Sequence, residues 1–409
     1  MKAIKYTTIT FFLFVLIIGA TSCKNQTSNN KSYVVMLSVD GFRWDYTEKV
    51  HTPNFDFIKK NGVKAKSLKP CFPTKTFPNH YSIATGLYPD NHGIVNNNFY
   101  DEKMDLFYRI GDRDAIENPE FYGGEPIWVT AEKQGIISAS YFWVGSEAAV
   151  CGTYPSYWKK YDHSFAFEQR IDSVIAWLEL PKNKRPQLIT WYMHEPDSEG
   201  HMSGTNSRDT KQTIIYLDSL VGVFLNKINN LPHKDQINLI FTSDHGMQDI
   251  SNDKIVNISN FADTSLIEIF TGGSPVFNLK IKPGFIDTFL SQISDVEHIF
   301  ACKSEDFPNR FHYGKNSRTL DVTIVADSAY TIVFNDGELS YLKGNHGYDN
   351  ENLNMHAIFY AIGPNFKSNY SHPTFDNIDI YPLIAEILQI DPAKVDGKLE
   401  DVIEMLEKY

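Results

Sequence analysis

The chain has 409 residues, of which 42% are hydrophobic, 14% aromatic and 22% charged. This is the composition of an ordinary globular protein, and it excludes a disordered, collagenous or coiled-coil chain. Aspartate and glutamate outnumber lysine and arginine by 50 to 38, which gives a net charge of −12. Binding of duplex nucleic acid is therefore not expected, and a phosphate substrate would need positive charge from bound metal ions.

The N-terminus has the pattern of an export signal. Two lysines precede an apolar run over residues 9–20, which is too short to span a membrane comfortably. Residues 20–23, Ala-Thr-Ser-Cys, resemble the cleavage box of bacterial lipoproteins. That resemblance implies a signal peptide over 1–22, a lipid on Cys23, a flexible tether over 23–31 and a place in the bacterial cell envelope. A plain cleaved signal or an uncleaved anchor is the alternative.

In chain order, apolar strands alternate with helices. Strands are predicted over residues 33–39, 187–193, 237–242, 322–325 and 357–361, and helices over 79–85, 168–178, 210–228 and 381–388. This alternation predicts an α/β protein whose mainly parallel sheet is covered by helices on both faces. No interior linker or repeat stands out, so residues 32–409 are expected to form a single domain.

Acidic residues follow three of these strands. Asp40, Asp197 and Asp244 each come just after a predicted strand, and ligands of such sheets bind beyond the carboxyl ends of the strands. Asp197 and His201 would share one face of a helical turn. Asp244 and its neighbour His245 would point apart at a strand end, so they could serve two ions or bridge around one.

A histidine in a glycine-rich loop completes this set. His346 lies in Gly-Asn-His-Gly, whose small residues let the loop approach a site closely. A single Asp/His pair near a strand end is usually a cap or a surface hydrogen bond, but all of these residues together predict a metal site. Oxygen and nitrogen ligands without thiolate suit zinc in open, catalytic coordination. The remaining histidines are expected to be structural.

Cysteine use does not indicate a thiolate site. With Cys23 lipidated, Cys71, Cys151 and Cys302 remain, and the sequence contains no C-x-x-C pair. A disulfide framework is therefore not expected. One disulfide with a free thiol, or three buried free thiols, both fit the sequence.

The segment 73–80, Pro-Thr-Lys-Thr-Phe-Pro-Asn-His, resembles the nucleophile segment of the nucleotide pyrophosphatase/phosphodiesterase family, within the alkaline phosphatase superfamily. Further blocks of resemblance occur in the family's order at residues 38–41, 92–94, 124–128, 195–201, 243–247 and 344–347. They cover nearly all of the chain after the predicted signal. The resemblance implies an alkaline phosphatase-like three-layer α/β/α sandwich with a mainly parallel central sheet, as one phosphodiesterase domain.

The resemblance also implies a site with two zinc ions. One ion would be bound by Asp40, Thr76, Asp244 and His245, and the other by Asp197, His201 and His346. Thr76 would be the nucleophile, because coordination to zinc favours the alkoxide of an otherwise poor nucleophile. Two ions would also suit both ends of an in-line displacement at phosphorus.

Other side chains have substrate roles in the same resemblance. Asn97 would donate its side-chain amide to a phosphate oxygen. The pocket for the nucleoside or other esterifying group would be lined by Phe77, Tyr161 and Tyr192. By sequence alone Thr74 is a competing hydroxyl, and the match to the family's Thr-Phe-Pro-Asn favours Thr76.

Sulfatases, which share a related fold, are a weaker interpretation. They use Cys-x-Pro-x-Arg, and the comparable residues here begin at Cys71 and end on Lys75 instead of arginine. Alignment of the two families places the sulfatase nucleophile near Thr76, so the short match at Cys71 is out of context.

A diester substrate is favoured over a monoester. Monoesterases clamp the extra charge of a phosphate dianion with additional cations, but residues 141–147 contain none, and Glu147 would repel a dianion. An aromatic slot for a planar group could be supplied by Phe77, Trp143 and Tyr161. The expected function is zinc-dependent hydrolysis of phosphodiester or pyrophosphate bonds in small molecules through a covalent threonyl intermediate. A phosphomonoesterase on the same two-zinc site is the alternative, a non-catalytic phosphate- or glycan-binding lipoprotein is a third interpretation, and the oligomeric state stays open.

Overall fold

The computed structural model describes residues 32–335 and 341–407, which belong to one compact unit that begins at Ser32. The predicted signal peptide, Cys23 and the tether lie outside these residues. No helix within the described ranges is long and apolar enough to cross a membrane.

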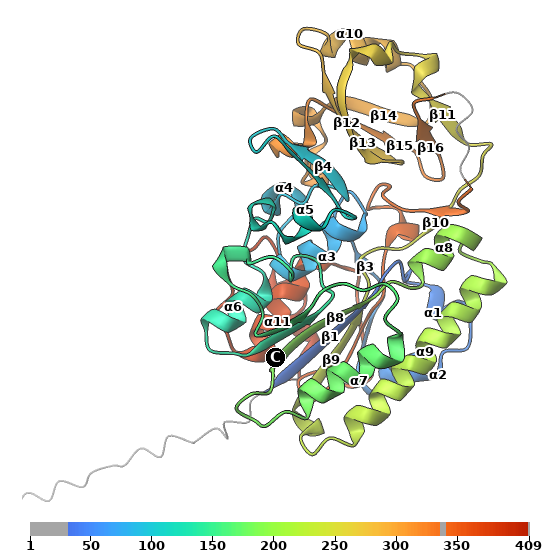
Figure 1. Ribbon diagram of the computed structural model, residues 1–409. Helices are drawn as coiled ribbons and strands as arrows, with labels where there is room; N and C mark the ends of the chain where they lie inside the picture. The colour runs from blue at the N-terminus through green and yellow to red at the C-terminus, as the bar shows by residue number, and fades with distance from the viewer. Residues whose placement is uncertain (1–31, 336–340, 408–409) are drawn as a thin grey trace, which may run out of the picture. The chain divides into compact units, whose positions relative to one another are not determined.

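An eight-stranded sheet forms the centre of the fold (Figure 1). Its order is β19 (Tyr370–His372), β2 (Val63–Ala65), β18 (Phe359–Ile362), β9 (Ile237–Thr242), β1 (Tyr33–Val39), β8 (Leu188–Met193), β6 (Ser138–Tyr141) and β7 (Tyr157–Lys159). β18 runs antiparallel to β9 and β2, and the other neighbouring strands are parallel. The predicted mainly parallel sheet is therefore confirmed.

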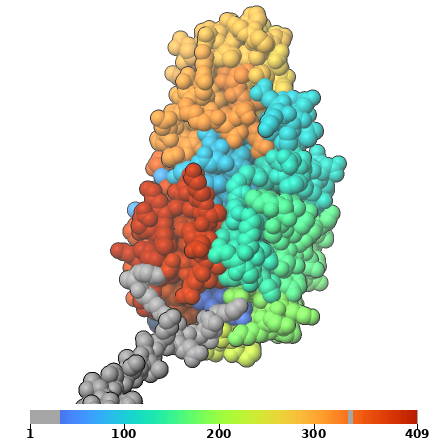
Figure 2. Space-filling model, turned by 90° about the vertical axis from the view of Figure 1, so that its left-hand side faces the viewer, coloured from blue at the N-terminus to red at the C-terminus, as the bar shows by residue number. Residues whose placement is uncertain are grey.

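Helices cover both faces of this sheet and make three layers. One face carries α2 (Pro53–Asn61), α7 (Phe167–Leu178) and α9 (Arg208–Asn229), and the other α3 (Thr76–Thr85), α6 (Ile127–Lys133) and α11 (Ile380–Leu388). Alternate residues of β1 serve the two cores: Val35 and Leu37 pack with the first set of helices, and Val34 and Met36 with the second. Figure 2 views the molecule from the side of the second set, where the C-terminal part of the chain, in red, lies at the surface. The predicted α/β/α sandwich is confirmed.

The three central strands end level with one another. Ser38 of β1 pairs with Tyr192 of β8 and with Thr242 of β9. The segments that follow these strands therefore begin side by side at the carboxyl edge of the sheet. This is the edge at which sheets of this type bind their ligands.

A second, antiparallel sheet lies between β9 and β18 in the sequence. Its order is β12 (Ile267–Gly273), β13 (Val276–Ile281), β15 (Val322–Ala326) and β14 (Ile299–Lys303), and α10 (Ile286–Ile293) packs on it. The predicted strand over 322–325 thus belongs to this sheet and not to the central one. The short turn between β12 and β13 permits only antiparallel pairing, because parallel strands need a long crossover. An ion pair of 2.9 Å between Lys280 and Glu102 joins the sheet to the hairpin of β4 (Asn98–Asp101) and β5 (Leu106–Arg109), cyan in Figure 2.

The remaining α-helices and strand pairs are shorter. They are the helices α1 (Tyr46–Lys49), α4 (Pro89–His92), α5 (Arg113–Glu117) and α8 (Asp197–Ser203), and the strand pairs β3 (Leu68–Lys69) with β20 (Phe375–Asp376), β10 (Gln248–Asp249) with β17 (Gly344–Asn345) and β11 (Ile255–Asn257) with β16 (Thr331–Val333). The helix predicted over 79–85 begins earlier, at Thr76. Pro78 is tolerated there because an N–H in the first turn has no helical acceptor to lose.

Candidate active site

Two carboxylates and a histidine converge at the carboxyl edge of the central sheet. Asp40 follows β1, Asp244 and His245 follow β9, and all three are buried. His245 Nε2 lies 3.1 Å from Asp244 Oδ2 and 3.5 Å from Asp40 Oδ1. The strand ends at Thr242, so the alternation that would point adjacent side chains apart no longer applies. Asp244 and His245 therefore lie in one group of possible metal ligands, together with Asp40.

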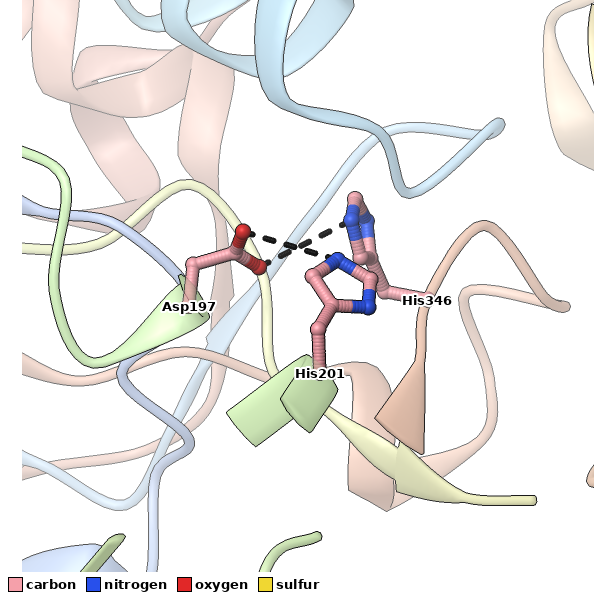
Figure 3. A group of neighbouring side chains, drawn as sticks. All are labelled: Asp197, His201 and His346. Atoms are coloured by element: carbon pink, nitrogen blue, oxygen red, sulfur yellow. Dashed lines mark ion pairs between the residues drawn. The ribbon is translucent and has the colours of Figure 1, made fainter. Parts of the chain in front are cut away.

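Asp197, His201 and His346 form a second group (Figure 3). Asp197 and His201 lie one turn apart on α8 and share a face, as their spacing predicts. His201 Nε2 is 3.5 Å from Asp197 Oδ2, and His346 Nε2 is 3.7 Å from Asp197 Oδ1. The rings of His245 and His346 stack with their centroids 3.6 Å apart, so the two groups adjoin.

Backbone carbonyls orient the three histidines of these groups. The Nδ1 atoms of His201, His245 and His346 bond to the carbonyl oxygens of Gly344, Gly246 and Thr74, at 2.7, 2.8 and 2.8 Å. A carbonyl oxygen only accepts, so each Nδ1 carries a proton and donates it. Each Nε2 is thereby directed toward the acids, which is the arrangement found when a metal binds at Nε2.

The acids of the two groups form no ion pair with lysine or arginine in the part of the chain that the structure describes. Burial, then the charges of Asp244 and Asp197, hold the pKa of Asp40 well above its usual range. Burial also works to raise the pKa of Asp244, but the His245 and His80 rings outweigh it and hold that pKa well below its usual range. One buried oxygen of each acid, Asp40 Oδ1, Asp197 Oδ1 and Asp244 Oδ2, has no hydrogen-bond partner among the described residues.

Both groups fit a divalent metal ion. Within each group the donor atoms lie within 4.8 Å of one another. Buried carboxylate oxygens without a donor are costly unless a cation binds them. Burial, assisted by His245 and Lys75, holds the pKa of His346 well below its usual value, which keeps this ring neutral for metal binding. Carboxylate and imidazole ligands without sulfur suit zinc.

The structure separates the two competing hydroxyls. Thr76, the first residue of α3, lines an open cavity, and its Oγ1 lies 3.3 Å from His245 Nε2. Thr74 is fully buried, and its Oγ1 donates to Tyr348 O at 3.1 Å and accepts from the Gly347 N–H at 2.9 Å. Thr74 therefore holds the loop behind the second group, and Thr76 is the one of the two hydroxyls that borders the cavity.

Two residues beneath the first group were not predicted as part of the site. His80 lies one turn after Thr76 on α3, with Nδ1 3.0 Å from Thr76 O and 3.4 Å from Asp244 Oδ2. Its Nε2 lies 2.9 Å from Ser38 Oγ. The spacing carries a signal for both, because positions i and i+4 share a helix face, and Ser38 lies two residues before Asp40 in chain order.

A cavity of about 270 Å³ opens onto Thr76 and onto acids of both groups. Most of its walls are apolar or aromatic, and they include Phe77, Ile110, Ile116, Tyr122, Phe142, Trp143, Val144, Tyr161 and Tyr192. The four aromatic residues predicted for the pocket therefore line one cavity. They are joined there by His163 and His194, which the sequence did not indicate, and by Ser198 from the 195–201 block. None of the lining residues in the described chain is a lysine or an arginine.

Tyr192 and Asn97 are both fixed by hydrogen bonds beside the reacting region. The Tyr192 hydroxyl donates to Asp40 Oδ2 at 2.6 Å, so Tyr192 orients an acid of the first group as well as lining the cavity. Asn97 Oδ1 accepts from the Phe77 N–H at 2.9 Å. This bond places the Asn97 side chain next to the first turn of α3, and its amide NH₂ group stays available to another acceptor.

Glu147 is not the isolated charge that the sequence predicts. It pairs with Arg113 of α5, and its Oε1 accepts from the Tyr161 N–H at 3.1 Å. A compensated carboxylate repels a dianion only weakly, so the expected repulsion does not distinguish monoesters from diesters. Its structural effect is to connect α5 with the wall residue Tyr161.

Cysteine chemistry does not contribute to the site. Cys71, Cys151 and Cys302 are all free thiols, which confirms the expectation of three free cysteines over one disulfide, but of the three only Cys71 is buried. Cys71 Sγ lies 3.1 Å from Asn377 Oδ1, and burial raises the pKa of this thiol. Cys71 does not line the cavity, which agrees with the rejection of a sulfatase.

Comparison with known proteins gives the same picture. Residues 34–349 match the family described as type I phosphodiesterase/nucleotide pyrophosphatase. A venom phosphodiesterase of Crotalus durissus collilineatus is 38% identical over 390 residues, 93% of this chain and 47% of the relative. Human ectonucleotide pyrophosphatase/phosphodiesterase family member 1 is 36% identical over 382 residues, 89% of this chain and 40% of the relative. The chain spans about half the length of these curated relatives.

Solved structures match over almost the whole chain. An inactive variant of murine ectonucleotide pyrophosphatase/phosphodiesterase 5 in complex with AMP has a TM-score of 0.88 and 32% identity, over 92% of this chain and 100% of that chain. The human counterpart has a TM-score of 0.88 and 33% identity. Fold and site together define an alkaline phosphatase-like α/β domain. The chain belongs to the type I phosphodiesterase/nucleotide pyrophosphatase family.

Proposed function

We propose that this protein hydrolyses phosphodiester or phosphoanhydride bonds in nucleotides and related diesters. The observation that carries the proposal is the position of Thr76, whose hydroxyl lies 3.3 Å from His245 Nε2 and borders the aromatic cavity. Membership of the family supports it, as do the relatives named phosphodiesterase and nucleotide pyrophosphatase and the AMP complex of a solved relative.

Two divalent ions, which we propose to be zinc, complete this site. One would be held by Asp40, Thr76, Asp244 and His245, and the other by Asp197, His201 and His346. When bound, zinc supplies Lewis-acid chemistry that lowers the pKa of a hydroxyl and neutralises charge on phosphate oxygens. The unpartnered acid oxygens and the orientation of the three histidines support this assignment.

Thr76 is the proposed nucleophile of a two-step reaction. Its Oγ1 loses its proton to solvent and forms a bond to phosphorus, while the bond to the leaving oxygen breaks and that oxygen takes a proton from solvent. Water then attacks the same phosphorus, the bond to Oγ1 breaks, and a proton from the water restores the Thr76 hydroxyl. The Asn97 amide would hold a non-bridging phosphate oxygen, because its carbonyl oxygen is already engaged by the Phe77 N–H. The nucleoside would contact Phe77, Tyr161 and Tyr192.

The lining of the cavity favours diesters over monoesters. In the described chain it offers aromatic surface and no lysine or arginine to bind the second charge of a dianion. Zinc-loaded enzyme should therefore split the nitrophenyl ester of thymidine 5′-monophosphate much faster than nitrophenyl phosphate. The reverse preference would assign a phosphomonoesterase, and no turnover of any diester with zinc bound would assign a binding protein.

We further propose that the protein is exported and held at the bacterial cell envelope by a lipid on Cys23. The apolar run over residues 9–20 and the Ala-Thr-Ser-Cys box support this proposal. Metabolic labelling with a fatty-acid analogue should mark the wild type and not Cys23→Ser. An unlabelled wild type would contradict the lipid anchor.

A further inference from the structure

Arg170 lies near the start of α7, behind the aromatic wall of the cavity, and is fully buried. Its guanidinium forms hydrogen bonds to backbone oxygens and no ion pair with a carboxylate of the described chain. Burial of a charge without water or a counter-ion is costly, so the surrounding groups must replace its hydration.

Carbonyl oxygens from two chain segments provide this replacement. Nε donates to Phe165 O at 2.9 Å and Nη1 to Tyr192 O at 3.1 Å. Nη2 lies 3.4 Å from the carbonyl oxygens of Asp162 and His163. The guanidinium carbon also lies 5.0 Å from the ring centroid of Phe142 and 4.8 Å from that of Phe167, so both rings face the charge.

Both segments carry walls of the cavity. Residues 161–165 precede α7, and Tyr161 and His163 from this loop line the cavity. Tyr192, near the end of β8, lines it from the sheet, and its ring lies 6.1 Å from that of Tyr161. The Tyr192 hydroxyl also donates to Asp40, so the same strand end supports the first group of acids. Arg170 is thus bonded to both walls at once.

We propose that Arg170 is a positioning residue that holds the 161–165 loop against the end of β8 and so sets the slot for the planar group of a diester. The inference rests on the proposed function. Arg170 acts through backbone oxygens and does not line the cavity itself. Its rigid, planar set of donors can bond two segments in fixed directions, which the single ammonium group of lysine cannot reproduce.

The test compares Arg170→Lys and Arg170→Gln with Arg185→Lys. Arg185 is a matched control because it also bonds to a carbonyl, Leu180 O at 3.0 Å, and faces a ring, that of Tyr33, before the start of β8. Each preparation is assayed with the nitrophenyl ester of thymidine 5′-monophosphate and with methyl nitrophenyl phosphate, which has no nucleoside. We expect KM for the nucleoside ester to rise roughly two- to tenfold in both Arg170 variants, the range for loss of one aromatic contact. In the Arg170 variants, KM for the methyl ester should stay unchanged. In Arg185→Lys, KM should stay unchanged for both diesters.

The comparison of two substrates on one preparation does not depend on how much of the protein has folded. An equal rise in KM for both diesters would overturn the inference and leave the proposed function intact. Binding of AMP can be measured without turnover, by calorimetric titration of the Thr76→Ala variant and of the double variant that also carries Arg170→Lys. Weaker AMP binding in the double variant supports the inference, and equal binding overturns it. A wild type that hydrolyses neither diester would instead overturn the proposed function.

Discussion

Thr74 and Thr76 are two residues apart, but their hydroxyls have different surroundings and different expected roles. Of the two, only Thr76 lines the cavity, so Thr76→Ala should lower kcat by roughly 10³-fold or more. The variant should still bind both ions through the remaining ligands. Thr76→Ser should keep part of the activity, because the hydroxyl remains and only the methyl that restricts its rotamer is lost. A chiral phosphorothioate diester should be hydrolysed with net retention, since each of two displacements inverts phosphorus. Net inversion, or a near-normal rate for Thr76→Ala, would contradict the covalent mechanism.

Thr74 should influence the metal site instead of the reaction step. Thr74→Val removes the hydroxyl that bonds to Gly347 N–H and Tyr348 O and leaves a buried N–H without its acceptor. Such a group costs about 1–3 kcal/mol, so the loop that carries His346 should bind its ion more weakly. Metal analysis after dialysis should give less zinc per chain than in the wild type, and Thr74→Ser should restore it. Wild-type zinc content in Thr74→Val would show that Thr74 does not orient His346.

Asn97 should contribute mainly to the transition state. If its amide donates to the phosphate oxygen on which charge develops, Asn97→Ala should lower kcat by roughly 10²-fold. The bond from the Phe77 N–H is lost as well, but that N–H is only partly buried and can bond to water. Steady-state kinetics with the nucleoside ester gives the measurement. A change in KM alone would mean that Asn97 binds the substrate without stabilising the transition state.

At the scale of elements, α9 fixes the start of α2 through one buried side chain. Asp218 accepts from the backbone N–H groups of Asn54 and Phe55, at 3.1 and 2.9 Å, and from the Asn54 side chain at 2.8 Å. The first N–H groups of a helix have no acceptor within that helix. The Asp218 carboxylate of α9 is the acceptor for these groups at the start of α2.

Asp218→Ala should therefore destabilise the protein without changing its chemistry. Loss of an acceptor for two backbone donors should lower the free energy of unfolding by about 2–4 kcal/mol, measured by urea denaturation. The exposed Asp209 on the same helix is the matched control, and Asp209→Ala should change it by less than about 1 kcal/mol. A loss of kcat/KM in folded Asp218→Ala would show that this contact also supports the site.

Close packing between elements also places the two groups of candidate metal ligands. Gly41 follows β1 with a φ of +65°, and a Cβ at this position would lie 2.9 Å from Asp197 Cα. Glycine is needed both for this backbone conformation and for the close approach of α8. The end of β1 and the start of α8 are thereby brought together, although Asp40 and Asp197 are far apart in the chain.

At the scale of the whole molecule, the buried acids of the site predict that the protein depends on bound cations, and its net charge of −12 adds no compensating positive charge. Chelation should abolish turnover and lower the melting temperature, and added zinc should restore both, because an ion that binds only the folded state stabilises it. Melting curves and activity on the same samples give the measurement. Full activity and an unchanged melting temperature after complete removal of metal would contradict this dependence.

Single substitutions should then separate the two ions. Asp197→Ala, His201→Ala and His346→Ala should each weaken one ion, and Asp244→Ala the other. Elemental analysis of the purified variants measures this directly. Two zinc ions retained in Asp197→Ala would contradict the assignment of its ligands.

The sequence by itself determined the class of fold and most of the residues that meet at the site. Apolar runs such as 33–39 and 237–242 are local features, and their burial on both faces of a parallel sheet follows from composition alone. The acids after these strands could be predicted as neighbours because the carboxyl ends of parallel strands share an edge.

Only the tertiary structure decided how these residues face one another. The direction of the His245 side chain depends on how the chain leaves β9. The different contacts of the Thr74 and Thr76 hydroxyls depend on the 346–348 loop, which is far away in the sequence. The pairing of Glu147 with Arg113 likewise brings together segments that no local pattern relates. Periodicity and propensity report on a residue's own element, whereas charge compensation and side-chain direction at an element's end depend on what packs there.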